Sequence, residues 1–167
     1  MNENVNLVDI DKMLPKIAEV LFEQEDLCKL LKYDTPNALS ESITQEDIKL
    51  IFNQDDISCR IFYQPFNDKI MSEKRAELRI YIPYINPLYN KVMSDIDIGF
   101  DIVVHNDMWR LDDSIIRPLK ILEILIEKLN GINIGNAFDL EFKDKCRIVF
   151  YNDNFTGYTF IMKTKSR

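Results

Sequence analysis

Carboxylate side chains are the residues of this sequence with the clearest potential for chemistry. Asp95, Asp97 and Asp101 alternate with apolar residues between positions 95 and 105. Alternation with a period of two is typical of a β-strand with one buried and one exposed face, so the three carboxylates should share the exposed face. Carboxylate oxygens are ligands that Mg²⁺ prefers. Function therefore depends on whether this acidic face meets a metal, a neighbouring subunit or water.

A second group of charged residues, Asp139, Glu141 and Lys143, alternates in the same way. Restriction-type nucleases place such residues on a strand, where the carboxylates bind the metal and the lysine orients the attacking water. The same alternation is expected of any half-buried strand with Leu140 and Phe142 inside. A Mg²⁺-dependent nuclease is therefore an alternative function for this chain.

Other residue types that can do chemistry give weaker signals. The single histidine, His105, ends the acidic strand, where a lone histidine is more often a surface or interface residue. The four glycines form no phosphate-binding motif. Cys28, Cys59 and Cys146 are far apart within apolar patterns, which favours buried free thiols over disulfides or a metal site. We expect no catalytic residue, no metal, no cofactor and no enzyme activity.

The composition indicates one folded domain over residues 1–167. Hydrophobic residues make up 46% and charged residues 29% of the chain, as in globular proteins. The net charge of −7 opposes a broad, non-specific grip on nucleic acid. No signal peptide and no bilayer-spanning apolar run is visible, which predicts a soluble protein made inside a cell, with no membrane partner.

Two helical regions are expected before the strands. Residues 10–31 show the apolar spacing of a helix, with a polar break at residues 23–26. Thr44 and Asp47 have the spacing of a capping box, which predicts a short helix that ends near Phe52.

A second long helix is expected from about residue 114 to residue 130. Asp113 or Ser114 can cap it, Pro118 suits its first turn, and Gly131 can end it. This helix is apolar around most of its circumference, so it must be covered on two sides. One side should pack on the sheet, and the other on the first helical region or on a neighbouring subunit.

Six strands are expected around that second helix. They cover residues 57–64, 75–84, 95–105, 137–142, 147–152 and 158–163. A turn at 154–157 should join the last two. The order α-α-β-β-β-α-β-β-β indicates an α+β domain with a largely antiparallel sheet packed by helices. The loops at 66–74 and 85–93 are long for hairpins and are expected to contact partners.

Several segments together carry a recognisable pattern. They are residues 17–21, 27–33, 96–105 with Trp109 beyond them, 117–118 and 155–158. In these segments and in its element order, the chain resembles the neck and tail-completion proteins of tailed bacteriophages, and in particular their tail terminators. Another neck or baseplate component is the nearest alternative, and a small cytoplasmic adaptor is a further one.

The resemblance implies a non-enzymatic structural protein. Tail terminators form rings, commonly hexameric, that cap the tail tube and join it to the neck. The implied partners are other copies of the chain, the tail tube protein and neck or head-completion proteins. DNA would pass through the ring without specific binding. The implied location is the tail or neck of the virion, after assembly in the host cytoplasm.

The resemblance also suggests roles for particular residues. Asp95, Asp97 and Asp101 would face the lumen, where they would repel the phosphates of passing DNA. The expected contacts between subunits are Arg75, Glu77, Arg79, Tyr81, Tyr84 and Tyr89. Ring formation requires that unlike surfaces of neighbouring subunits meet head to tail.

Overall fold

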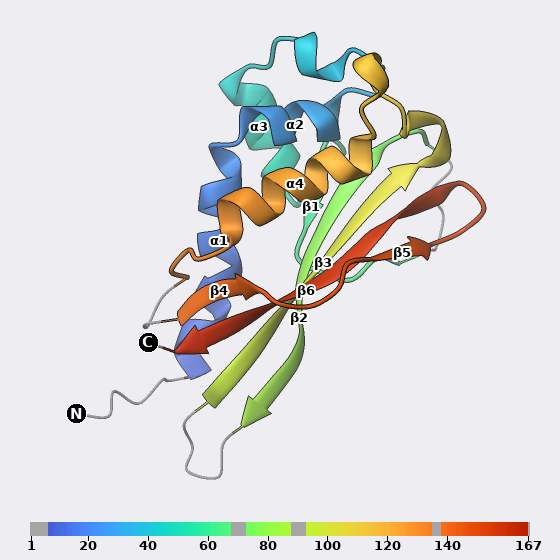
Figure 1. The fold of residues 1–167 in the computed structure, drawn as a ribbon. Helices are drawn as coiled ribbons and strands as arrows, with labels where there is room; N and C mark the ends of the chain where they lie inside the picture. The colour runs from blue at the N-terminus through green and yellow to red at the C-terminus, as the bar shows by residue number, and fades with distance from the viewer. Residues whose placement is uncertain (1–6, 68–72, 88–92, 135–137, 167) are drawn as a thin grey trace.

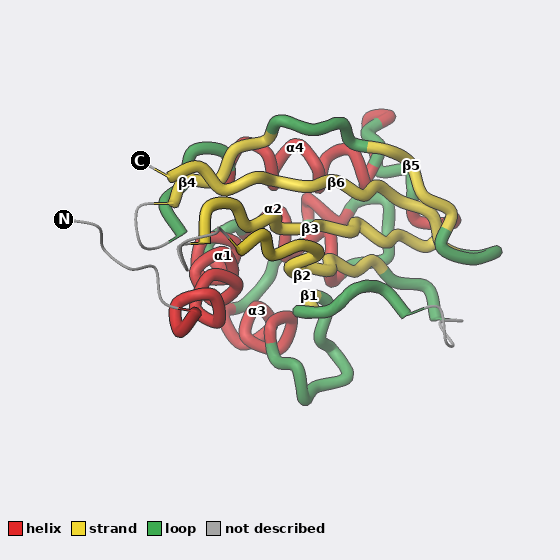
Figure 2. The backbone as a smooth tube through the Cα atoms, turned by 90° about the horizontal axis from the view of Figure 1, so that it is seen from below, coloured by secondary structure: helices red, strands yellow, loops and turns green. Residues whose placement is uncertain are grey.

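Helices cover one face of a single open sheet (Figure 1). The computed structural model describes residues 7–67, 73–87, 93–134 and 138–166. Seen from below, α4 lies behind the strands, α1 and α3 lie beside them, and the opposite face of the sheet carries no helix of the described residues (Figure 2). This two-layer arrangement confirms the predicted α+β class.

The described residues form four α-helices and six strands. The helices are α1 (Met13–Phe22), α2 (Glu25–Lys32), α3 (Gln45–Phe52) and α4 (Arg117–Leu129). The strands are β1 (Ile61–Phe62), β2 (Ala76–Pro87), β3 (Met93–His105), β4 (Phe138–Phe142), β5 (Arg147–Phe150) and β6 (Phe155–Ser166). The sheet has the order β1-β2-β3-β6-β4, and β5 also pairs with β6. Every pair is antiparallel except β1 with β2, as the largely antiparallel prediction requires.

The β2–β3 hairpin is the longest feature of the sheet. Its register shifts by one residue where Ile82 and Pro83 lie opposite Ile98. Proline cannot donate a ladder hydrogen bond and is confined to edges and bulges, so Pro83 explains this irregularity. The hairpin continues past the end of the β3–β6 pairing, which stops at Asp97. The loop predicted at 85–93 lies largely outside the described residues.

Strands β4 and β5 pair with the same edge of β6 in succession. Phe142 lies opposite Met162, and Arg147 lies opposite Thr159. Four residues of this edge, 143–146, therefore face only two residues of β6. The two short strands are one edge strand interrupted by a bulge.

The predicted turn at 154–157 is wrong, because β6 begins at Phe155. The turn is instead formed by residues 151–154, where the side chain of Asn152 accepts hydrogen bonds from the amides of Asn154 and Phe155. Gly157 lies within the strand. The residue there is a glycine because a Cβ atom would overlap the carbonyl oxygen of Ile102 on β3. A glycine required by close strand packing resembles, in the sequence, a glycine required by a turn.

The first predicted strand, 57–64, is reduced to the two residues of β1. Most of the segment before β1 is held in turns by local hydrogen bonds. Asp56 accepts a bond from the amide of Ser58 at 2.7 Å, and Gln54 donates to the carbonyl of Ile61 at 2.7 Å. Asp and Asn side chains that bond nearby backbone groups compete with strand pairing.

The helices largely follow the predicted periodicity. The break at residues 23–26 separates α1 from α2, and the capping box of Thr44 and Asp47 is present at the start of α3. The predicted cap of α4 is wrong. Asp113 and Ser114 have positive φ values of 59° and 62° in a separate 3-10 turn, and Ile116 precedes the helix without a side-chain cap.

Helix α4 is covered on two sides, as its apolar circumference requires. It packs on β3, β4 and β6 on one side and on α1 and α2 on the other. The first helical region, rather than a neighbouring subunit, therefore provides the second cover. Gly131 follows the helix with φ of 84°, as predicted for a helix end. Beneath the helices, the rings of Phe100 and Phe160 stack at 4.9 Å across β3 and β6.

Candidate functional site

Charged residues of β2 form a buried network on the face of the sheet that carries no helix. The side chain of Glu77 has 0% exposure. Its oxygens form ion pairs with Arg79 at 2.5 Å and with Arg75 at 2.6 Å. The guanidinium of Arg79 also lies over the ring of Phe62, 3.9 Å from its centre. These charges are neutralised within the chain, which suits a structural role.

Asp101 lies beside this network, on β3. Its carboxylate accepts hydrogen bonds from the hydroxyl of Thr159 at 2.6 Å and from that of Tyr81 at 3.2 Å. Burial raises the pKa of Asp101 despite these bonds and a further bond from the amide of Phe66. Burial, followed by the charge of Asp101, raises the pKa of Tyr81 to about 12.

Aromatic residues from two loops cover the buried charges. Phe66, before β2, meets Tyr151, after β5, with ring centres 5.0 Å apart, and it also lies 6.4 Å from the ring of Phe155. Burial raises the pKa of Tyr151. Within the described part of the chain its hydroxyl is buried without a hydrogen-bond partner. The charged network and its cover therefore form a second small core on this face.

The three predicted lumen residues are in different environments. Asp101 is on the predicted face but is only 7% exposed and is bonded within the chain. Asp97 is half-buried and lies opposite Lys163 on β6. The backbone of Asp95 belongs to β3, but its side chain lies outside the described residues. A lumen role would therefore depend on Asp95 and Asp97, and it stays a prediction.

The predicted contact residues also divide into two groups. Glu77 and Arg79 are buried, with Arg75 and Tyr81 half-buried beside them. The ring of Tyr81 packs on Gly99, where a Cβ atom would be 2.7 Å from Cε2 of the tyrosine. Tyr84 is 61% exposed near the end of the hairpin. Tyr89 lies outside the described residues.

The groups that suggested a nuclease do not form a metal site in the described residues. Glu141 and Lys143 form an ion pair with each other on the edge strand β4. Nowhere in the described ranges do three His, Cys, Asp or Glu side chains lie close enough together to hold a metal. His105 accepts a hydrogen bond from the amide of Asp107 through Nδ1 at 3.2 Å, and its ring meets Phe155 at 5.2 Å. This histidine therefore holds the turn after β3.

The cysteines are free thiols, as predicted. Cys28 and Cys59 are buried, whereas Cys146 is half-buried. Burial raises the pKa of all three thiols, that of Cys28 to about 12. A thiol that stays protonated is a poor nucleophile, so the three residues have the properties of packing residues.

Arg117 is a residue whose role the sequence did not reveal. It has 0% exposure at the start of α4. Its guanidinium donates to four main-chain carbonyls at 2.6–2.8 Å, those of Leu30, Tyr33, Thr35 and Met108. Burial lowers its pKa to about 10, so the group remains charged at neutral pH. Position 117 was notable only as the arginine before Pro118, which does not reveal burial.

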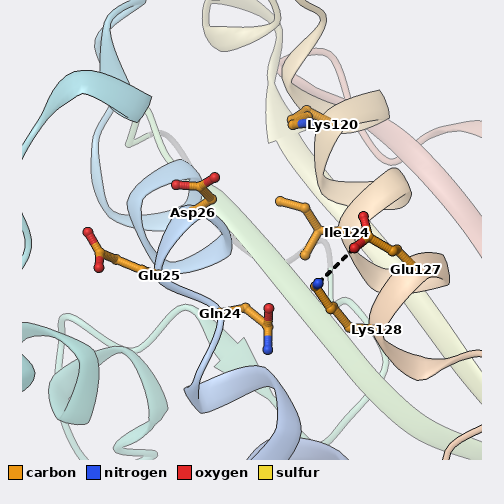
Figure 3. Close-up of a pocket in the computed structure, with 7 residues that line it drawn as sticks. All are labelled: Gln24, Glu25, Asp26, Lys120, Ile124, Glu127 and Lys128. Atoms are coloured by element: carbon orange, nitrogen blue, oxygen red, sulfur yellow. Dashed lines mark hydrogen bonds and ion pairs between the residues drawn. The ribbon is translucent and has the colours of Figure 1, made fainter.

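A polar hollow of about 450 Å³ lies between α2 and α4 (Figure 3). Its lining residues are Gln24, Glu25, Asp26, Lys120, Ile124, Glu127 and Lys128. Most of the charged groups have a partner on their own helix: Lys128 bonds Glu127 at 2.7 Å, and Glu25 bonds Lys29 at 2.7 Å. Such intrahelical pairs are typical of a solvated surface, so the hollow offers no evident chemistry.

Exposed large apolar side chains are the remaining candidate for function. They are Leu50, Ile57, Tyr84, Ile85, Leu119, Ile148 and Phe150. Two of them lie in β5 at one margin of the sheet, two in the β2–β3 hairpin and one in the turn before β1, whereas Leu50 and Leu119 are on α3 and α4. Apolar groups at exposed margins are typical of surfaces that contact other protein chains.

No helix within the described ranges has both the length and the apolar character needed to cross a bilayer.

Comparison with known proteins identifies a family. The model of the YomW family matches residues 24–164, a span that runs from the start of α2 into β6 and includes the buried charged network. Searches of curated proteins and of solved structures found no match. The chain therefore belongs to the YomW family, which is named after a protein of a Bacillus phage region and indicates a phage-associated protein.

Proposed function

We propose that this chain is a non-enzymatic structural protein of the phage neck or tail, acting as a tail terminator. Copies of the chain would form a ring that caps the tail tube and joins it to the connector beneath the head. Membership of a phage-associated family supports the phage setting. The observation that carries the structural role is the exposure of large apolar residues on β5, on the β2–β3 hairpin and in the turn before β1.

The chemistry of the described residues agrees with such a role. Asp101, one of the carboxylates that first suggested catalysis, accepts a hydrogen bond from Thr159 inside the subunit, and Glu141 forms an ion pair with Lys143. The buried Glu77 is likewise paired, with Arg75 and Arg79. Buried, mutually bonded charges fix the arrangement of strands rather than meet a substrate. That the chain is not an enzyme and needs no cofactor stays a prediction.

The proposed mechanism is geometric. A ring that matches the symmetry of the tube would stop further polymerisation of the tube protein and present a new face to the neck. Tyr84 and Ile85, exposed near the end of the β2–β3 hairpin, are suitable contacts for a neighbouring ring. Asp97 would keep a negative charge near the passing DNA.

Electron microscopy of purified virions or tail assemblies tests this proposal. A ring of α+β subunits at the head-proximal end of the tail tube would support it. A ring elsewhere in the particle would favour another neck or baseplate role and would contradict the terminator. Absence of the chain from virions would refute the structural role.

Enzyme activity is tested separately with the substitution Glu141→Gln. The proposal predicts that purified protein with Mg²⁺ does not cleave DNA, with or without this change. Cleavage that Glu141→Gln abolishes would favour the nuclease instead. Glu123→Gln, which removes an exposed carboxylate of α4 in an ion pair with Lys120, is the matched control.

A further inference from the structure

The two margins of the sheet, which one cross-strand row connects, differ in charge. Ile148 of β5 pairs with Tyr158, which pairs with Ile102, then Leu78 and finally Ile61 of β1. This row crosses the whole sheet, so β5 and β1 lie at its opposite margins (Figure 2). The charged and apolar residues at these two margins can therefore be compared.

The margin beside β1 is acidic. The turn that leads from α3 into β1 carries Asp55, Asp56 and Ile57, which we call the acidic end. Ile57 is 85% exposed, the highest exposure among the large apolar residues described. Neither aspartate forms an ion pair with any residue that the structure describes. The acidic end therefore presents two aspartates that form no ion pair within the described ranges beside an exposed apolar side chain, while the nearby Arg60 donates to the carbonyls of Ile57 and Cys59.

The margin at β5 is basic. Lys145, Arg147, Ile148 and Phe150 form what we call the basic end. Phe150 is 76% exposed and Ile148 is 47% exposed, since β5 extends beyond α4, which packs on β3, β4 and β6. Within the described ranges Lys145 and Arg147 have no ion-pair partner, whereas the neighbouring Asp144 pairs with Lys163 at 3.3 Å. Like the acidic end, the basic end thus combines charged residues with exposed apolar side chains, and its charge is the opposite.

We infer that the acidic end of one subunit binds the basic end of the next. Unlike charges attract across such a contact, whereas two acidic ends or two basic ends would repel each other. A contact between unlike surfaces is head to tail, and it closes into a ring when the rotation between subunits allows. The inference deepens the proposed ring function, on which it rests, because it names the surfaces through which the copies meet.

Side chains, rather than an added strand, would make this contact. Strand β1 has only two residues, and Pro83 and Pro87 remove amide donors from the exposed edge of β2. Short edges and edge prolines oppose pairing with a further strand. Ile57, Ile148 and Phe150 would supply the apolar burial, and the four charges would select the partner end.

Charge reversal at each end tests the inference by sedimentation velocity over a range of concentrations. The wild-type chain should self-associate, and added salt should weaken the association. The double variants Asp55→Lys/Asp56→Lys and Lys145→Glu/Arg147→Glu each give a subunit with like charges at both ends, and each should be monomeric. An equimolar mixture of the two should associate again, since every junction in the mixture can join unlike charges.

Two further variants separate this contact from the effect of net charge alone and test its apolar part. Glu19→Lys/Glu23→Lys, on α1 and directly after it, makes the same change in net charge as the acidic-end variant and should associate like the wild type. Phe150→Ser should weaken association by about tenfold or more without reversing a charge. Circular dichroism of each monomer checks that the variants fold.

Three results would overturn the inference: a wild-type chain that is monomeric at every concentration, reversed ends that associate like the wild type, or a mixture that does not recover. Other results would distinguish failure of the proposed function from failure of this inference. Recovery in the mixture, with no copy of the chain in virions, would refute the tail role alone. A ring in the tail whose assembly tolerates charge reversal would refute these ends alone.

Discussion

Replacing Arg117 by methionine should destabilise the fold more than any other single loss of charge in the described residues. The guanidinium, with 0% exposure, joins the end of α2, the following loop and the turn after β3 to the start of α4. Methionine keeps most of the side-chain volume but donates no hydrogen bond. The carbonyl acceptors would stay in place after the change and would lose their partner.

The size of the effect follows from those carbonyls. The bonds from Arg117 to Leu30 and Met108 are buried, whereas those to Tyr33 and Thr35 are partly buried, where water can replace the donor. An unsatisfied buried acceptor costs about 1–3 kcal/mol, so two of them cost about 2–6 kcal/mol. Removal of one partner from a buried charged interaction typically costs about 3–5 kcal/mol, which is in agreement. Domains of this kind have a total stability of about 5–15 kcal/mol.

Urea denaturation followed by circular dichroism measures the change in the free energy of unfolding. Arg117→Met should lower it by about 3–5 kcal/mol. The free energy of unfolding of Arg117→Lys should lie between those of the wild type and Arg117→Met. The lysine keeps the charge, but a single ammonium cannot reach all four carbonyls. Arg110→Met removes an exposed arginine and should change stability by less than about 0.5 kcal/mol. An Arg117→Met variant within about 1 kcal/mol of the wild type would refute this reasoning.

Three further predictions concern the sheet and its carboxylates. Gly157→Ala should lower the free energy of unfolding by about 3 kcal/mol or more, because the new Cβ would overlap the carbonyl of Ile102; an unchanged melting temperature would contradict this. Asp47→Ala should cost about 0.5–2 kcal/mol at neutral pH through loss of its cap and ion pair with Lys32. The pKa of Asp47 is lowered to about 2, so the stability that its carboxylate contributes should disappear as the pH falls from 3.8 through 2 in urea titrations. A stability difference between wild type and Asp47→Ala that persists at the lowest pH would show that it does not come from the ionised carboxylate. The pKa of Asp101 is raised above 3.8, so ionisation of its carboxyl should lower the free energy of unfolding as the pH rises through the folded pKa. Asp101→Asn should remove that part of the pH dependence of stability. Identical pH dependence in the wild type and the variant would argue against this effect.

The elements predicted most accurately are those with strong periodicity or a complete local signal. The alternation from 95 to 105 placed its apolar residues in the core, and the Thr44–Asp47 capping box started α3 as expected. Gly131 ended α4 because its φ of 84° is a local requirement. These features depend on neighbours in the sequence, so a single sequence contains the information needed.

The features that the sequence did not reveal depend on distant contacts. Gly157 faces a carbonyl of β3, and Arg117 reaches carbonyls more than 80 positions earlier in the chain. Asp101 looks like an exposed strand residue until Phe66 and Tyr151 are seen to cover it. For the candidate site, the pattern therefore gave the correct face of the sheet but not which of its residues are buried.

Cryo-electron microscopy of phage tails that contain this chain is the decisive test of the proposed ring. We expect a closed ring of this chain at the head-proximal end of the tail tube, with Asp55–Ile57 of each subunit against Lys145–Phe150 of the next. Tails that carry no such density, or a chain located outside the virion, would contradict the proposed function.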